Sequence, residues 1–219
     1  MGLGFFVVLV AIAAFGLFFV GQGGRTPPAR AAMAAASWPA DQAGQEAEFW
    51  KIIDATTPAN RGGESQLPEL KDRLMQLPID DLEKFIRVYD RLMARTYSWD
   101  LWGAAYVVQG GASDDAFEDF RKWLISQGRT DFERVSHDPD SLADALPMGH
   151  EGDATFEEFS HLFADIWTER TGKPLTALPK DKDALYPPEP VGAPFSEDPK
   201  QLAARYPKLW LRFGEEPLQ

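Results

Sequence analysis

The sequence predicts an all-α domain that follows one apolar N-terminal segment and precedes a proline-rich tail. Three observations predict this. Apolar residues between positions 45 and 172 recur at helical spacing. No segment alternates convincingly as a strand would, outside the short Val107–Val108 fragment. Prolines accumulate after Gly172, where they exclude long helices. The 219 residues suit one domain with tails, and we expect five or six helices around an aromatic core.

The first element is an apolar segment, Leu3–Val20, of 18 residues without a charged side chain. As a helix it would extend roughly 27 Å, close to the roughly 30 Å hydrocarbon core of a bilayer. A helix that is apolar on every side has no face for water. Residues 1–21 are therefore predicted to be a single transmembrane anchor. Its aromatic side chains would face lipid: Phe5, Phe6, Phe15, Phe18 and Phe19.

Two other interpretations of this segment stay open. A cleaved signal peptide is less favoured, because no basic residue precedes the run and the best cleavage site, Ala34–Ala36, lies far beyond it. A wrongly assigned start codon would also place an apolar run here. If the segment is an anchor, Arg25 and Arg30 favour a cytoplasmic C-terminal side. The predicted location is the bacterial inner membrane, with the domain in the cytoplasm.

Residues 22–44 are rich in Gly, Ala and Pro and are predicted to form a linker. Trp38 would then be an exposed aromatic residue that rests at the membrane interface or on a partner. The charge changes sharply at this boundary. Residues 1–44 carry a net charge of +1, whereas residues 45–219 carry −13.

The domain, residues 45–172, divides into helices by its apolar spacing. A long periodic stretch from 80 to 110 exceeds ordinary helix lengths, so we expect an interruption near Thr96–Ser98. Ser113 is a suitable N-cap for the helix after it, with Asp114 and Asp115 in the first turn. The other predicted helices cover residues 46–57, 67–77, 138–146 and 156–171.

The tail, residues 173–219, contains nine prolines and is predicted to run extended over the domain surface. A disordered acidic tail is the alternative. Bulky apolar residues favour docking, and six of them would serve as anchors: Phe195, Tyr206, Leu209, Trp210, Leu211 and Phe213.

Several motifs within the domain resemble a known family. They are Phe49–Asp54, Tyr97–Tyr106, Gly110–Phe117, Phe120–Gly128 and Asp138–Leu142. Together they resemble the bacterial domain-of-unknown-function family 4240 over about residues 47–170. The resemblance implies a shared fold and a cytoplasmic setting, but no reaction. The membrane segment would be a departure from that pattern.

Composition excludes several functions. A net charge of −12 and a pI near 4.7 argue against nucleic-acid binding, which needs clustered Lys and Arg. With no cysteine, the chain has no thiol catalysis and no cysteine metal site. Glu157, His161 and Asp165 share a helical face that a metal could use, but a solvated face is the favoured interpretation. No catalytic residue, metal or cofactor is predicted.

The best polar cluster combines carboxylates, one arginine and aromatic rings. Paired carboxylates can hold a cation or act as acid and base, and aromatic walls with few polar groups can bind a small ligand. A purely structural role is favoured over catalysis, because first-turn aspartates need no other explanation. The candidate ligand- or partner-binding residues are Trp99, Asp100, Trp102, Tyr106, Asp114, Asp115 and Arg121.

Two functions remain open. The first is a membrane-anchored accessory or scaffold protein without catalysis, whose acidic domain docks on an integral membrane protein complex or a cytoplasmic protein. The second is a small-molecule-binding or hydrolytic domain that uses the cluster between Trp99 and Arg121.

Overall fold

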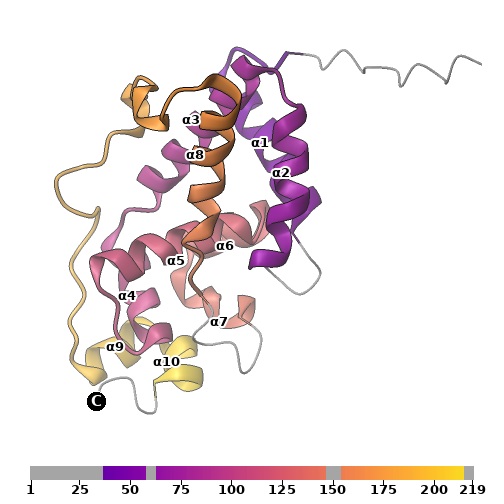
Figure 1. The fold of residues 1–219 in the computed structure, drawn as a ribbon. Coiled ribbons are helices and arrows are strands. Elements are labelled where there is room, and N and C mark those ends of the chain that lie inside the picture. Colours follow the sequence, from indigo (N-terminus) through magenta and orange to yellow (C-terminus); the bar gives the residue numbers. More distant parts are fainter. Residues whose placement is uncertain (1–36, 58–62, 147–153, 215–219) are drawn as a thin grey trace, which may run out of the picture. The chain divides into compact units, whose positions relative to one another are not determined.

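A computed structural model describes residues 37–57, 63–146 and 154–214, all within one compact unit (Figure 1). The described residues form ten α-helices and no strand, so the predicted all-α class is confirmed. Their one isolated β-bridge joins Ser98 to Val191. The predicted anchor, Leu3–Val20, lies outside these residues. Within the described part of the chain, no helix is long and apolar enough to cross a bilayer.

Five helices surround the larger part of the core. α3 packs against α1, α5 and α8, and α2 contacts both α1 and α8. These helices and the short 3₁₀ turn before α2 are α1 (Gln42–Thr56), η1 (Glu64–Gln66), α2 (Leu67–Gln76), α3 (Ile79–Arg95), α5 (Asp114–Ser126) and α8 (Glu158–Thr171).

The remaining elements pack against α5, against α1 or against one another. α6 contacts α1 and α5, while α4 contacts α5 and the C-terminal helix α10. They are α4 (Trp99–Gln109), α6 (Arg129–His137), η2 (Pro139–Ser141), α7 (Leu142–Ala145), α9 (Pro199–Arg205) and α10 (Pro207–Phe213).

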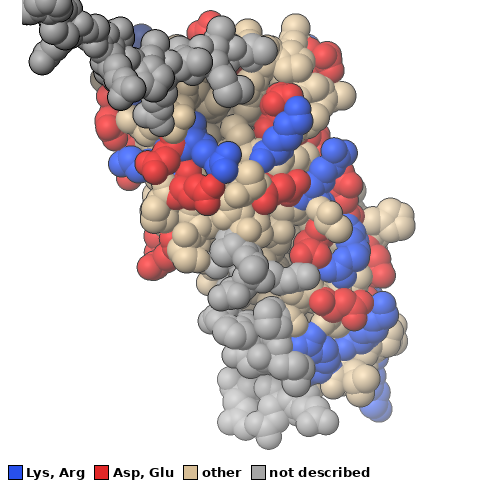
Figure 2. Space-filling model, turned by 90° about the vertical axis from the view of Figure 1, so that its right-hand side faces the viewer, with Lys and Arg blue, Asp and Glu red and all other residues tan. Residues whose placement is uncertain are grey.

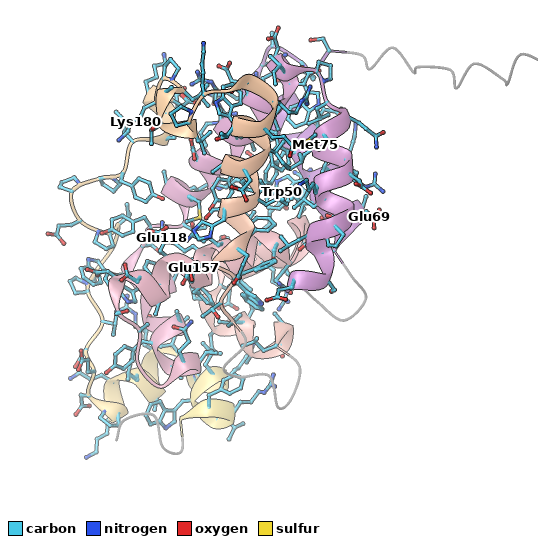
Figure 3. All side chains as sticks on the ribbon, viewed as in Figure 1. Trp50, Glu69, Met75, Glu118, Glu157 and Lys180 are labelled. Carbon is cyan, nitrogen blue, oxygen red and sulfur yellow. The ribbon has the colours of Figure 1, made fainter. Side chains whose placement is uncertain are left out.

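Aromatic rings fill the interior, as the sequence predicts. Phe85 lies 4.6 Å from Phe49 and 5.2 Å from Phe163 between ring centroids. Trp50, labelled in Figure 3, is 2% exposed and packs on Phe132 at 5.0 Å. Because aromatic side chains bury large areas and pair favourably at these distances, they supply much of the burial that stabilises the domain.

Trp38 belongs to this core, so its prediction as an exposed linker residue is wrong. Its side chain is 7% exposed and meets Phe85 edge-on at 6.3 Å. Its backbone N–H donates to the buried Asp81 carboxylate at 3.0 Å, and Lys84 pairs with the same carboxylate. The Asp41 side chain accepts from the Gly44 N–H and opens α1 at Gln42, before the predicted linker ends.

The number of helices also differs from the prediction. Between residues 42 and 171 the described residues form eight α-helices rather than five or six. The predicted interruption is present, because α3 ends at Arg95 and Ser98 caps α4 by accepting from the Leu101 N–H at 3.2 Å. α6 is the helix in this range that the sequence did not predict, whereas η2 and α7 lie within the predicted helix 138–146.

The C-terminal segment is only partly extended. Residues 173–198, which we call the strap, contain the short turns η4 (Leu175–Ala177) and η5 (Lys182–Ala184) and run along one side of the domain (Figure 1). The strap then enters α9 and α10, which the sequence reading did not predict. Tyr206 and Leu209 are buried as expected, whereas Leu211 is 82% exposed and anchors nothing within the described residues.

Candidate functional site

A cavity of about 270 Å³ lies between the first turns of α5, the turn that joins α3 to α4, and the strap. We call it the Arg121 cavity. Four of the seven predicted site residues line it, together with four residues that were not predicted. The lining residues are Tyr97, Trp102, Asp114, Asp115, Phe117, Glu118, Arg121 and Tyr186.

Arg121 is the cation at the inner end of this cavity. Its side chain is only 4% exposed. One guanidinium nitrogen, Nη1, donates to the Met93 carbonyl at 2.8 Å and to the Tyr186 hydroxyl at 3.3 Å. Nε is buried and donates to no atom of the described residues. No carboxylate of the described residues lies within salt-bridge distance of Arg121.

Aromatic rings surround the guanidinium instead. Its Cζ atom lies 4.9 Å from the ring centre of Phe117, 5.2 Å from Tyr97 and 5.4 Å from Tyr186. Rings at these distances attract a cation through their electron-rich faces. Three rings therefore replace part of the hydration that Arg121 loses, although they supply no negative charge.

A stack of flat rings forms one wall of the cavity. Trp102 lies 4.9 Å from Phe117 with only 9° between the planes, and Trp99 stacks behind Trp102 at 5.2 Å. The Trp102 indole N–H donates to the Ala112 carbonyl at 3.0 Å, which fixes its orientation. This wall is rigid and apolar.

Carboxylates form the mouth of the cavity. Asp114 and Asp115 are exposed in the first turn of α5, where the helix dipole favours negative charge. Ser113 caps that turn as predicted. Glu118 lies one turn further, on the side of α5 towards the strap (Figure 3), and pairs with Lys122 at 3.0 Å. Asp114 and Asp115 pair with no cation of the described residues.

The other three predicted site residues lie outside the cavity. Asp100 pairs with Arg205 of α9, with Nε at 2.9 Å. Tyr106 is buried against Phe195 at 5.2 Å, and Trp99 meets the same ring edge-on. The structure thus divides the predicted cluster. Part of it lines a cavity, and Trp99, Asp100 and Tyr106 hold the C-terminal segment on α4.

Sequence reasoning missed Tyr97, Phe117, Glu118 and Tyr186 as cavity residues. Phe117 and Glu118 carried a weak signal, because they precede Arg121 by four and three positions and so share its helix face. Tyr186 carried none, since it reaches the cavity from the strap, 65 residues further along the chain.

A second cavity lies beside the first, on the other side of Tyr186, and Asp90 and Asp181 line it together with Lys180. Burial, followed by the Asp181 carboxylate, raises the pKa of Asp90 to about 6. Although burial alone would raise the pKa of Asp181, the Asp183 N–H and the Arg91 guanidinium lower it. Arg91 reaches Asp181 at 2.7 Å and fastens the strap to α3. Lys180 stands at this end of the strap (Figure 3).

The two linings offer carboxylates, tyrosines, one arginine and one lysine. Neither cavity lining contains a histidine or a serine, which could form a nucleophile and base pair. Among the described residues, no group of three or more His, Asp or Glu side chains is placed to hold a metal ion. Glu157, the residue before α8, is exposed, as are His161 and Asp165 on α8.

Comparison with protein families identifies the domain. Residues 45–169, more than half of the chain, match the family described as "Protein of unknown function (DUF4240)". The chain belongs to this family. The match covers nearly the same residues as the resemblance seen in the sequence, and it extends from α1 to the last turn of α8. No curated protein and no solved structure matches the chain.

Proposed function

We propose that the protein is a membrane-tethered accessory module of this family, and that its acidic helical domain docks on a basic surface of an integral membrane protein complex. The observation that carries the proposal is a group of exposed apolar side chains on the strap. Leu185 is 65% exposed, Tyr186 47% and Val191 64%. The only other large apolar side chain so exposed in the described part of the chain is Leu211 on α10, at 82%.

The strap presents these side chains on a fixed backbone. Val191 forms two backbone hydrogen bonds with the residues between α3 and α4. Its N–H donates to the Tyr97 carbonyl at 3.0 Å, and its carbonyl accepts from the Trp99 N–H at 2.9 Å. The Arg91–Asp181 ion pair holds the other end. Prolines 187, 188 and 190 stiffen the segment between them. We call Leu185, Tyr186 and Val191 the ridge. Because the ridge is already held in place, binding a partner costs less conformational entropy, which favours a docking role.

Charge indicates the kind of partner. Exposed carboxylates beside the ridge, Asp114, Asp115 and Glu189, pair with no cation of the described residues. On the α2 side of the domain, by contrast, acidic and basic side chains interleave (Figure 2), and on α2 itself Arg73 pairs with Glu69. An apolar ridge with unneutralised acids at its edge suits a partner that presents apolar and basic groups together.

The membrane part of the proposal rests on the sequence. Leu3–Val20 is long and apolar enough for one bilayer crossing. Arg25 and Arg30 favour a cytoplasmic domain at the bacterial inner membrane. Because residues 45–219 carry a net charge of −13, anionic lipid would repel the domain, and a protein partner suits it better than the lipid surface.

The test is the size of the native particle after mild detergent extraction. We expect the wild-type chain to migrate in a large complex, and a Leu185→Ser, Val191→Ser double variant to migrate as a free chain. Leu211→Ser is the matched control, because it removes a more exposed apolar side chain from α10 and should leave the complex intact. A wild-type chain that is a free monomer at native abundance would end the proposal.

Small-molecule binding in the Arg121 cavity is the second candidate. It is favoured by one observation, the buried arginine that has aromatic neighbours and no carboxylate partner among the described residues. A hydrolytic role has less support, because the described residues that line the cavity include no serine or histidine, and Asp114 and Asp115 are exposed first-turn residues.

A further inference from the structure

We propose that the Arg121 cavity binds a free α-amino acid with a small apolar side chain. Its carboxylate would lie on Arg121, and its ammonium group would point towards Asp114 and Asp115. This inference rests on the second candidate above, small-molecule binding, and it names the class of ligand.

The inner end of the cavity calls for an anion. An arginine side chain stays ionised at any ordinary pH, so it cannot escape the cost of burial by losing a proton. Arg121 is 96% buried, yet its partners are a carbonyl, a tyrosine hydroxyl and three rings, all of them uncharged. Burial raises the pKa of Tyr186, so its hydroxyl stays neutral. A ligand carboxylate would supply the missing charge and form charge-assisted hydrogen bonds.

The mouth of the cavity calls for a cation. Asp114 and Asp115 are exposed carboxylates without a cationic partner in the described residues, and Glu118 adds a third carboxylate, shared with Lys122. Phosphates and dicarboxylates would meet repulsion here, because they carry more than one negative charge and no positive group. A simple amine would satisfy the mouth but leave Arg121 uncompensated. Only a molecule that carries a carboxylate and an ammonium group together matches both regions.

The walls and the volume limit the rest of the ligand. Trp102 and Phe117 offer a flat apolar surface, with Tyr97 and Tyr186 around it. A volume of about 270 Å³ corresponds to about nine water molecules at roughly 30 Å³ each. An amino acid of about nine non-hydrogen atoms, the size of leucine, therefore fits.

The experiment measures binding by calorimetry on the full-length chain in mild detergent with three probes. Leucine carries both charges, 4-methylpentanoate lacks the ammonium group, and isopentylamine lacks the carboxylate. We expect leucine to bind at least about tenfold more tightly than either other probe, since each lost charged contact weakens binding by about that factor or more.

Variants show which residues contact the ligand carboxylate and which contact its ammonium group. Arg121→Met should reduce leucine binding at least about tenfold while 4-methylpentanoate binding falls with it. Asp114→Asn with Asp115→Asn should weaken leucine binding and leave 4-methylpentanoate unchanged or tighter. Asp72→Asn with Asp165→Asn is the control, because it makes the same change in net charge at exposed positions on α2 and α8. Melting temperatures of all variants report whether each one is folded.

The outcomes separate the ligand class from the site. The amino-acid class is wrong, although the cavity is a binding site, if 4-methylpentanoate binds as tightly as leucine and Arg121→Met abolishes its binding. The same holds if isopentylamine binds as tightly as leucine and the Asp114, Asp115 variant abolishes its binding. If no probe binds the folded wild-type chain, the inference is wrong and the second candidate function loses its support. Equal loss in the Asp72, Asp165 control would also overturn the inference, because the effect would then be one of net charge alone.

Discussion

Gly103 sets how closely the C-terminal segment approaches α4. It is buried in the middle of that helix, and a Cβ atom added to it would collide with the Tyr206 hydroxyl and press on the Phe195 ring. Tyr206 uses that hydroxyl to donate to the Asp100 carbonyl at 2.9 Å. The glycine is therefore required by close packing rather than by an unusual backbone angle.

We predict that Gly103→Ala lowers the free energy of unfolding by about 1–3 kcal/mol, the usual cost of overfilling a packed site. Chemical denaturation of both variants would measure this. In a Tyr206→Phe background the same substitution should cost less, because the hydroxyl that the new methyl group meets is gone. Equal costs in the two backgrounds would show that another contact is responsible.

Asp90 gives the domain a dependence on pH with a definite sign. Its pKa rises to about 6 in the folded chain, whereas an unfolded aspartate titrates near 4. Between these values the folded chain binds a proton that the unfolded chain does not. The stability that Asp90 contributes is therefore complete below about pH 4 and is lost as the pH rises through about 6.

We predict that Asp90→Asn stabilises the chain at pH 7 by about 2 kcal/mol and has little effect at pH 4. The asparagine mimics the protonated acid, so it removes the cost of holding a charge in a half-buried place beside Asp181. Thermal unfolding of the wild type and the variant across this range is the measurement. The prediction would be contradicted if the gain in stability of Asp90→Asn over wild type were no larger at pH 7 than at pH 4.

The site illustrates which residues a sequence can reveal. Trp102, Asp114, Asp115 and Arg121 were predicted because they lie within one short stretch that combines charge with aromatic rings. Tyr186 was not, because its place depends on where the strap crosses the domain, and no local pattern encodes that path. Asp100 lies in the same short stretch, yet its carboxylate pairs with Arg205 on α9.

The strap is fastened to the domain at several points, and an ion pair beside η5 is one of them. Arg91 and Asp181 form an ion pair in which the side chains are only 16% and 10% exposed. Arg91 also donates to the Gln45 side chain at 3.0 Å, so one guanidinium joins α1, α3 and η5. Removing one partner of a shielded ion pair lowers the stability of a protein much more than removing one partner of an exposed pair.

We predict that Arg91→Met increases proteolytic cleavage within residues 173–198 at least about fivefold, which corresponds to about 1 kcal/mol of lost local stability. Limited proteolysis followed by mass spectrometry would locate the cuts. Arg73→Met is the control, because its pair with Glu69 is exposed and joins residues one turn apart. Similar cleavage in both variants would mean that the Arg91 pair does not secure the strap.

At the level of helices, the sequence predicts well wherever burial leaves a periodic trace. The predicted break at Thr96–Ser98 is present because α4 begins from its own cap, Ser98. α6 escaped prediction because it buries only Phe132 and Val135. α9 and α10 escaped because proline was taken as a helix breaker, whereas Pro199 and Pro207 occupy the first turn, where a missing N–H costs nothing.

The whole chain combines two segments of opposite character. An apolar run without charge precedes 175 residues that carry a net charge of −13, so a single average hydropathy or charge describes neither part. Only the acidic part is among the described residues, and no helix there could cross a bilayer. The proposed membrane attachment rests on the N-terminal run.

We predict that removal of residues 1–21 releases the chain from membranes, whereas the full-length chain stays in the membrane fraction after an alkaline carbonate wash that strips peripheral proteins. The wash disrupts electrostatic contacts with the membrane, but a segment of about eighteen apolar residues stays inserted in the bilayer. The truncated chain should also fail to bind vesicles of anionic lipid, since its domain carries the same sign of charge. Release of the full-length chain by the wash would show that the apolar run does not span the bilayer. Retention of the truncated chain would show that the domain itself attaches to the membrane. Leu185 and Val191 of the exposed ridge would then be the first residues to substitute.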